Sequence, residues 1–169
     1  VFVLLSGVLL WWQIRRQYMF AEQLQQKQWQ LEQLSYHDQL TGVKNRHYLD
    51  EIIAGEMARA DRYKQPLSML IFDLDHFKKV NDTWGHPVGD LVLKHTAEII
   101  GDRIRKADIL VRIGGEEFVV LMPETRLAGA REAAESLRAA LAANEHPIAG
   151  KVTASFGVAE RMKVEPFAY

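Results

Sequence analysis

Two neighbouring carboxylates follow a pair of glycines at residues 114–118, which read Gly-Gly-Glu-Glu-Phe. This segment lies between two apolar runs, 109–113 and 118–122, and paired glycines at so short a connection predict a β-hairpin turn. Adjacent carboxylates repel each other unless a cation lies between them, and glycines without Cβ let a large ligand approach the backbone. A magnesium ion that holds phosphate groups would meet both conditions. The alternative is an ordinary acidic turn in solvent.

A second acidic pair follows residues 67–73, a mostly apolar run of strand length. Such a run predicts a central strand that is covered on both faces. Asp73 and Asp75 lie at its carboxyl end, where the ligand sites of open α/β sheets are found. Capping of the next helix by Asp75 is the alternative explanation.

The remaining pattern predicts the elements that must position these acids. We expect helices at 47–63, 91–104 and 126–143, a short helical turn at 76–80 and a last strand at 151–159. The buried positions that we predict are Leu49, Ile52, Ile53, Met57 and Ala60 in the first helix and Leu93, Ala97, Ile100 and Ile104 in the second.

Two connecting features are also predicted from residue type. Thr125 is expected to cap the third helix through its side chain. Residues 81–90 are rich in Asn, Asp, Gly and Pro and predict a polar loop. That loop either presents amides and carboxylates to a nucleobase or simply connects two helices.

The first residues of the chain resemble the inner end of a membrane helix. Residues 1–12 carry no charge, end in Trp11 and Trp12, and are followed by Arg15 and Arg16. Tryptophan favours the membrane interface and arginine the cytoplasmic side, so we expect residues 1–13 in the inner membrane and the rest in the cytoplasm. The run is shorter than the roughly 20 residues that span a bilayer, and we therefore expect the chain to begin within that helix. A signal peptide or a buried core helix are the alternatives.

Residues 14–36 are glutamine-rich, without Gly or Pro, and predict a linker helix. Its main apolar residues, at positions 18, 21, 24, 31 and 34, have the spacing of a narrow coiled-coil seam. A coiled coil would hold two copies of the chain together. A solvated connecting helix explains the pattern equally well.

The composition excludes some functions. The 169 residues suffice for one compact domain and an additional segment. The net charge of −1 and the pI near 6.7 leave no basic footprint for nucleic acid. Without cysteine the chain has neither a disulfide framework nor a thiolate metal site.

Three ordered motifs give the chain a resemblance to a known family. They are residues 38–46 (DQLTGVKNR), residues 72–90 (FDLDHFKKVNDTWGHPVGD) and the GGEEF segment. Together they resemble the GGDEF family of diguanylate cyclases over about residues 35–159. The resemblance implies that residues 37–169 form an α/β (α+β), palm-like nucleotide-cyclase domain, with a central mixed sheet flanked by helices.

The resemblance also implies a reaction. Two GTP molecules, one on each subunit of a head-to-head homodimer, would condense to cyclic di-GMP with the loss of two pyrophosphates. The alternatives are a non-catalytic receptor for cyclic di-GMP and a signal relay that acts by dimerising through residues 14–36.

Catalytic and metal-binding roles follow from the same resemblance. Asp73, the backbone carbonyl of Leu74 and Glu116 would hold Mg²⁺, with Mn²⁺ as a possible substitute, and Glu117 lies beside the same ions. Glu116 is also the proposed proton acceptor for the 3′-hydroxyl, although one carboxylate serving as both ligand and base is chemically awkward. Lys78 would stabilise the transition state at the phosphates.

Substrate and product sites are implied as well. Asn81 and Asp90 match positions that read guanine, and His86 matches another substrate contact. Arg105 and Asp108 form an RxxD segment just before the hairpin, where the family binds cyclic di-GMP as an inhibitor. An exposed ion pair at a helix end is the alternative for that segment.

The resemblance is incomplete in two places. A helper arginine of the family's product site corresponds to Ser136 here, with Arg138 nearby. After residue 158 nothing resembles the family's C-terminal helix, whose basic residues reach the phosphates. We therefore expect a chain truncated at both ends, which would bind and turn over substrate less well than the intact protein.

Overall fold

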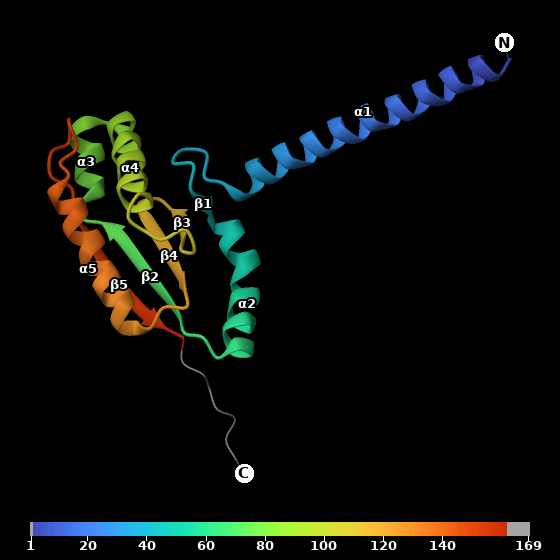
Figure 1. Cartoon of the computed structure of the whole chain (residues 1–169). Coiled ribbons are helices and arrows are strands. Elements are labelled where there is room, and N and C mark those ends of the chain that lie inside the picture. The colour runs from blue at the N-terminus through green and yellow to red at the C-terminus, as the bar shows by residue number, and fades with distance from the viewer. Residues whose placement is uncertain (1, 162–169) are drawn as a thin grey trace. The chain divides into compact units, whose positions relative to one another are not determined.

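The computed structural model describes residues 2–161, and within them the side chains of 2–10, 26, 28–30 and 32–35 are left out of the description. The chain divides into two units, Val1–Ser35 and Tyr36–Tyr169. The first unit contains helix α1 (Phe2–Tyr36) except for its last residue, and the second holds Tyr36 and all the other elements (Figure 1). The predicted domain at 37–169 includes residues 162–169, which lie outside the described residues.

The second unit is built on one mixed five-stranded sheet in the order β1-β3-β4-β2-β5. Its strands are β1 (Lys44–Asn45), β2 (Leu67–Leu74), β3 (Ile109–Gly114), β4 (Glu117–Pro123) and β5 (Ala154–Glu160). The pair β1–β3 is parallel and the other pairs are antiparallel. The predicted mixed sheet, the central position of β2 and the β3–β4 hairpin are therefore confirmed.

Helices cover the two faces of the sheet unequally. On one face lie α3 (Phe77–Trp84), α4 (His86–Gly101) and α5 (Leu127–Ala143), and on the other lies α2 (Arg46–Tyr63) (Figure 1). The larger core lies under the three helices, where the Phe72 ring is stacked between Phe118 at 5.2 Å and Phe156 at 4.6 Å. This packing ties β2 to both of its neighbours and so fixes the register of the sheet.

The prediction that β2 is covered on both faces is wrong. Helix α2 packs on β3 and β4 through residues such as Val111 and Val119 and reaches only the first part of β2, at Leu67 and Met69. Ile71 in the middle of β2 is consequently 47% exposed. Met57 of α2, predicted to be buried, is 38% exposed, whereas Leu49 and Ala60 of the same helix are buried as predicted.

The predicted polar loop at 81–90 is also wrong, because these residues belong to two helices. Only Gly85 separates α3 from α4. It adopts φ +81°, a conformation that glycine accepts readily, and its N–H donates to the carbonyl of Asn81 at 2.8 Å. Pro87 lies in the first turn of α4, where a missing N–H costs nothing. The helix predicted at 91–104 therefore begins earlier and ends at Gly101, and Ile104 lies beyond it.

The predicted cap of α5 is wrong as well. The Thr125 hydroxyl donates to the carbonyl of Pro123 at 3.0 Å and not to α5. The N-cap residue of α5 is Arg126, and its side chain makes no capping hydrogen bond. Instead the carboxylate of Glu160 on β5 accepts the N–H of Leu127 at 2.7 Å. The stabilising anion at the N-terminus of α5 thus comes from a distant part of the chain.

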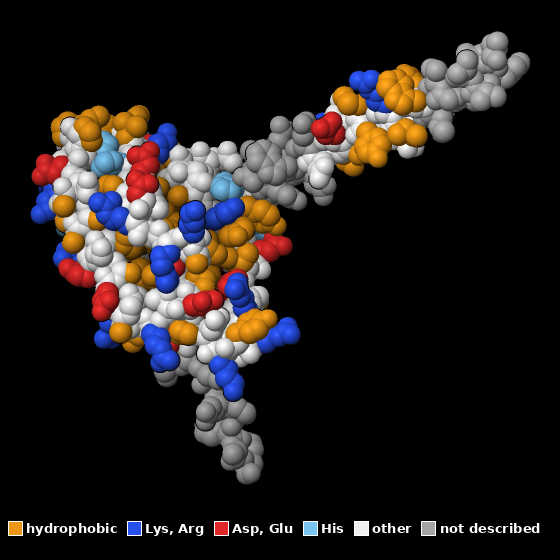
Figure 2. All heavy atoms as spheres, in the orientation of Figure 1, with side chains coloured by type: hydrophobic (Ala, Val, Ile, Leu, Met, Phe, Trp, Pro, Cys, Tyr) orange, Lys and Arg blue, Asp and Glu red, His pale blue; other side chains and the backbone are white. Residues whose placement is uncertain are grey.

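Helix α1 is continuous through the predicted boundary between membrane segment and linker. In its described part Tyr18, Phe20, Leu24 and Leu31 are exposed, and Figure 2 shows apolar and basic side chains next to each other there. The structure does not describe the side chain of Leu34 in the predicted seam or the side chains of 2–10. Across the residues that the structure describes, we find no helix with the length and apolar character needed to cross a membrane.

Candidate active site

The two acidic segments meet at one edge of the sheet. In the β2–β4 ladder Asp73 pairs with Glu117, and in the β2–β5 ladder it pairs with Ser155. Directly paired residues of an antiparallel ladder point to the same face, so the Asp73 and Glu117 carboxylates are neighbours. Glu116 precedes Glu117 at the hairpin tip. The structure thus brings together residues that are more than 40 positions apart in the chain.

The glycines leave the hairpin tip open. The register shifts between Arg112 and Gly114, and Gly115 adopts φ +48°, in the left-handed region that favours glycine. Around the positions where a Cβ would lie on Gly114 and Gly115 there is no other atom within 4 Å. A bulky ligand can therefore approach this backbone, as the sequence predicted.

The charges at this edge repel one another. Partial burial raises the pKa of Asp73, and the negative charges of Glu116, Glu117 and Asp75 raise it further. Within residues 2–161, no three His, Asp or Glu side chains converge closely enough to hold a metal ion. The carboxylates are thus near enough to sense each other's charge without being gathered into a ligand set.

Asp75 has a different role from Asp73. Its carboxylate accepts hydrogen bonds from Ser155 Oγ at 2.7 Å and from Thr153 Oγ1 at 2.6 Å. These bonds, from Ser155 first and then Thr153, lower the pKa of Asp75. Asp75 therefore joins β2 to the start of β5 and does not cap α3, whose N-cap residue is His76.

The predicted substrate residues lie on the two helices that follow this edge. Lys78 is exposed in the first turn of α3, which begins three residues after β2 ends, and Asn81 lies one turn later. His86 and Asp90 are exposed in the first turns of α4. Since Gly85 alone joins the two helices, all four residues belong to one helical corner at the carboxyl end of β2.

Arg112 is a site residue that the sequence analysis missed. Its guanidinium donates to both oxygens of Asp38, at 3.0 and 3.2 Å, and through Nε and Nη2 to the carbonyl of Gly115, at 3.0 and 2.7 Å. Asp38 also accepts from the hydroxyl and the N–H of Thr41, at 2.6 and 2.9 Å. Arg112 therefore connects the turn of the first motif to the tip of the third. The only hint in the sequence is an arginine two residues before the glycines.

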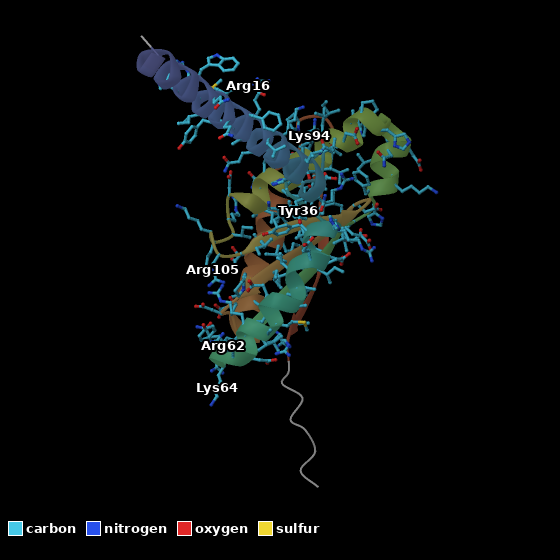
Figure 3. All side chains as sticks on the ribbon, turned by 90° about the vertical axis from the view of Figure 1, so that its right-hand side faces the viewer. Arg16, Tyr36, Arg62, Lys64, Lys94 and Arg105 are labelled. Carbon is cyan, nitrogen blue, oxygen red and sulfur yellow. The ribbon has the colours of Figure 1, made fainter. Side chains whose placement is uncertain are left out.

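Arg105 and Asp108 form an ion pair, although not the exposed pair at a helix end that was the alternative for the RxxD segment. Arg105 Nη2 and Nε donate to Asp108 at 2.8 and 3.1 Å, and the Asp108 side chain is only 1% exposed. Arg105 itself lies on the loop between α4 and β3 and is half-exposed, so donors remain accessible to a ligand (Figure 3). Both residues line a surface groove of about 360 Å³, together with Arg103, Thr125 and Ser136.

Arg138 does not line this groove. Its guanidinium is instead paired with Glu135 at 2.6 and 2.9 Å on the exposed face of α5. Arg103 is the second basic residue of the groove, and it donates to the carbonyl of Ile99 at 3.2 Å. The groove therefore has two arginines, although not the pair suggested by the sequence.

Comparisons with known proteins agree with this geometry. The family model "Diguanylate cyclase, GGDEF domain" matches residues 35–165. Diguanylate cyclase DgcP of Pseudomonas aeruginosa is 45% identical over 72% of this chain and 18% of its own length. Response regulator PleD of Caulobacter vibrioides is 41% identical over 75% of this chain and 29% of its own length. The chain thus spans less than a third of either relative.

Solved structures give the same result. The coiled coil and GGDEF domain of DgcB from Caulobacter crescentus, in complex with c-di-GMP, superposes with a TM-score of 0.82 at 27% identity, over 89% of this chain and 82% of that one. The active GGEEF domain of a diguanylate cyclase from Vibrio cholerae gives a TM-score of 0.68 at 32% identity, over 72% of this chain and 79% of that one. The expected α+β cyclase-domain fold is confirmed.

The link between Asp38 and Arg112 predicts a pH-dependent stability. Burial raises the pKa of Asp38, but hydrogen bonds from Thr41 and Arg112 outweigh it and lower the pKa overall. The ionised carboxylate therefore stabilises the fold above the ordinary carboxyl pKa near 4, and this stabilisation is lost as the pH falls through the lowered value. We expect Asp38→Asn to lower the free energy of unfolding by about 1–3 kcal/mol at pH 7 and by less as the pH falls below the ordinary carboxyl pKa.

Urea unfolding across this pH range measures the difference. Asp50→Asn is the matched control, because Asp50 is exposed and lies 3.9 Å from its partner Arg46. That variant should stay within about 0.5 kcal/mol of the unchanged protein. An equal loss for Asp38→Asn at pH 3 and pH 7 would contradict a role of the charged carboxylate.

Proposed function

The chain belongs to the GGDEF family of diguanylate cyclases, and from this membership we propose that the protein condenses two molecules of GTP into cyclic di-GMP and two pyrophosphates. The observation that carries the proposal is the direct pairing of Asp73 with Glu117, next to Glu116 on an open glycine tip. The relative DgcP, which is named a diguanylate cyclase, supports it.

We assign Mg²⁺, or Mn²⁺ in its place, to Asp73, the carbonyl of Leu74, Glu116 and Glu117. The donor set fits, because these ions prefer hard oxygen ligands. Burial and then repulsion by the neighbouring carboxylates raise the pKa of Asp73, and a bound cation would relieve that repulsion. When bound, the ion would neutralise charge that develops on the phosphoryl oxygens. Because the described carboxylates are not gathered into a ligand set, binding would require the hairpin tip to move toward Asp73.

The side chains of the chain itself supply the other parts of the reaction. Glu116 accepts the proton of the 3′-hydroxyl, whose oxygen then attacks the α-phosphorus of the second GTP. The bond from the α-phosphorus to the pyrophosphate oxygen breaks, and the electron pair leaves with pyrophosphate. The exposed ammonium of Lys78 on α3 offsets the charge that accumulates there.

Base recognition is assigned to the helical corner between α3 and α4. Asn81 offers an amide, Asp90 a carboxylate that can accept from N1–H and the exocyclic amine of guanine, and His86 a further polar contact. Phosphate contacts alone would not distinguish guanine from adenine. These residues supply that selectivity.

Dimerisation follows from the chemistry proposed. Each chain has one such edge, and the product contains two nucleotides, so two copies must face each other as a homodimer. We assign α1 the role of a coiled coil that holds the copies together, which the exposed apolar residues of its described part support. We also propose attachment to the inner membrane at Trp11 and Trp12, followed by Arg15 and Arg16 on the cytoplasmic side.

We assign inhibition by cyclic di-GMP to the groove at Arg105 and Asp108. A half-exposed guanidinium whose orientation is fixed by a buried carboxylate is well suited to bind guanine or phosphate. The same groove supports the second candidate function, a receptor that binds cyclic di-GMP without making it. The acidic edge favours the enzyme, because a receptor has no need of it.

Replacing Glu116 tests the proposed reaction. We expect Glu116→Gln in the full-length protein to lower cyclic di-GMP synthesis at least about 100-fold, because the proton acceptor and one charge are lost. Chromatography of reactions with GTP and Mg²⁺ gives the rate, and thermal unfolding shows that the fold is retained. Glu98→Gln, on the exposed face of α4, is the matched control and should keep the full rate. Turnover within twofold of the unchanged protein would remove Glu116 from the mechanism.

Replacing Arg105 tests the inhibitory site. We expect Arg105→Ala to raise the concentration of cyclic di-GMP that halves the rate at least about tenfold, because a charge-assisted contact is lost, while the initial rate is unchanged. Arg138 pairs with Glu135 outside the groove, so cyclic di-GMP should inhibit the Arg138→Ala variant as strongly as the unchanged protein. Unchanged inhibition of Arg105→Ala, with the melting temperature preserved, would rule out this groove.

A further inference from the structure

Gly89 is a glycine in a place where glycine is unfavourable. It lies buried in the second turn of α4, and glycine in a helix costs about 1 kcal/mol relative to alanine. Its backbone does not require glycine, since Gly89 is not among the residues of positive φ. Some other constraint must therefore exclude a side chain at this position.

That constraint is the side chain of Asn81. A Cβ on Gly89 would lie 2.0 Å from Asn81 Oδ1, 3.0 Å from Asn81 Cγ and 3.2 Å from Phe77 Cζ. Two other helical glycines, Gly55 in α2 and Gly101 in α4, have no atom within 4 Å of that position. The amide of Asn81 thus occupies the space that a side chain at Gly89 would take.

The backbone holds Asn81 against Gly89. The Asn81 carbonyl accepts the N–H of Gly85 at 2.8 Å, and the Gly85 carbonyl accepts the N–H of Gly89 at 3.2 Å. Both residues are therefore fixed to the same corner glycine. Asn81 is partly exposed, and with its Oδ1 packed against Gly89 the amide N–H donors of the same side chain can face a ligand.

We propose that Gly89 is the positioning residue of the guanine site: its missing side chain lets the Asn81 amide pack against α4 at the residue that precedes Asp90. The inference rests on the proposed function, in which Asn81 and Asp90 read the base. A side chain at position 89 pushes the Asn81 amide away from α4, so that it no longer binds the same base as the Asp90 carboxylate. Guanine loses a partner, whereas a base that makes no use of the amide loses little.

Nucleotide binding tests the inference without turnover. 3′-Deoxy-GTP and 3′-deoxy-ATP lack the attacking hydroxyl and cannot condense, so titration calorimetry on the full-length protein yields dissociation constants directly. The unchanged protein should prefer the guanine nucleotide. Gly89→Ala should raise the dissociation constant of 3′-deoxy-GTP at least about tenfold and that of 3′-deoxy-ATP less than about twofold. Gly55→Ala is the matched control and should bind both nucleotides like the unchanged protein.

A double variant separates positioning of Asn81 from general packing. Asn81→Ala alone should weaken the binding of 3′-deoxy-GTP as much as Gly89→Ala does. The dissociation constant of the double variant should stay within about twofold of that of Asn81→Ala, because both changes remove the same contact. The melting temperature should fall less when Gly89→Ala is added to Asn81→Ala than when it is made alone. This comparison decides the question even where Gly89→Ala alone does not fold.

Four results would overturn the inference. Unchanged guanine affinity in Gly89→Ala would show that the amide is not displaced. A further tenfold loss in the double variant, or an equal fall of the melting temperature in both backgrounds, would show that Gly89 serves only the packing of α3 on α4. An unchanged protein with no preference for guanine would overturn the proposed base recognition itself, and this inference with it.

Discussion

Electrostatic repulsion at the carboxyl end of β2 is the constraint on which the rest of the structure depends. The β2–β4 register places Asp73 directly opposite Glu117, and the core contacts of Phe72 with Phe118 and Phe156 fix that register. A slip by one residue would move the acids to the opposite face and expose these rings. The packing of the buried face therefore keeps these like charges together. A bound cation would remove the repulsion between them.

The surroundings of this edge keep it open and in place. Gly114 and Gly115 leave room at the tip, while Arg112 holds the Gly115 carbonyl and the Asp38 carboxylate at the same time. Because Asp38 follows closely on the first residue of the second unit, the segment that enters this unit is bonded to the hairpin that carries Glu116. The first and third sequence motifs are thus parts of one hydrogen-bonded network.

The sequence predicted the parts of the fold that depend on local pattern. Apolar runs gave the strands β2, β3 and β4, and the paired glycines gave the hairpin, because these signals lie within a few residues. The helices at 77–101 were mistaken in part for a loop, since Asn, Asp, Gly and Pro are usual in turns, whereas the buried residues of α3 and α4 appear only in the folded structure. The cap of α5 by Glu160 and the Asp38–Arg112 pair join residues 33 and 74 positions apart, which no local pattern reveals. The close contact of Asn81 with Gly89 likewise appears only in three dimensions.

The central claim is that the edge formed by Asp73, Glu116 and Glu117 binds a divalent cation. The most direct test measures the melting temperature of the protein and of Asp73→Asn over a Mg²⁺ titration. We expect Mg²⁺ to stabilise the unchanged protein, because a ligand that binds only the folded state raises its stability. Without metal, Asp73→Asn should be more stable by about 0.2–1 kcal/mol, since one of two directly opposed charges is removed, and Mg²⁺ should add little to it. Equal stabilisation of both proteins by Mg²⁺, or a less stable Asp73→Asn in its absence, would contradict the account.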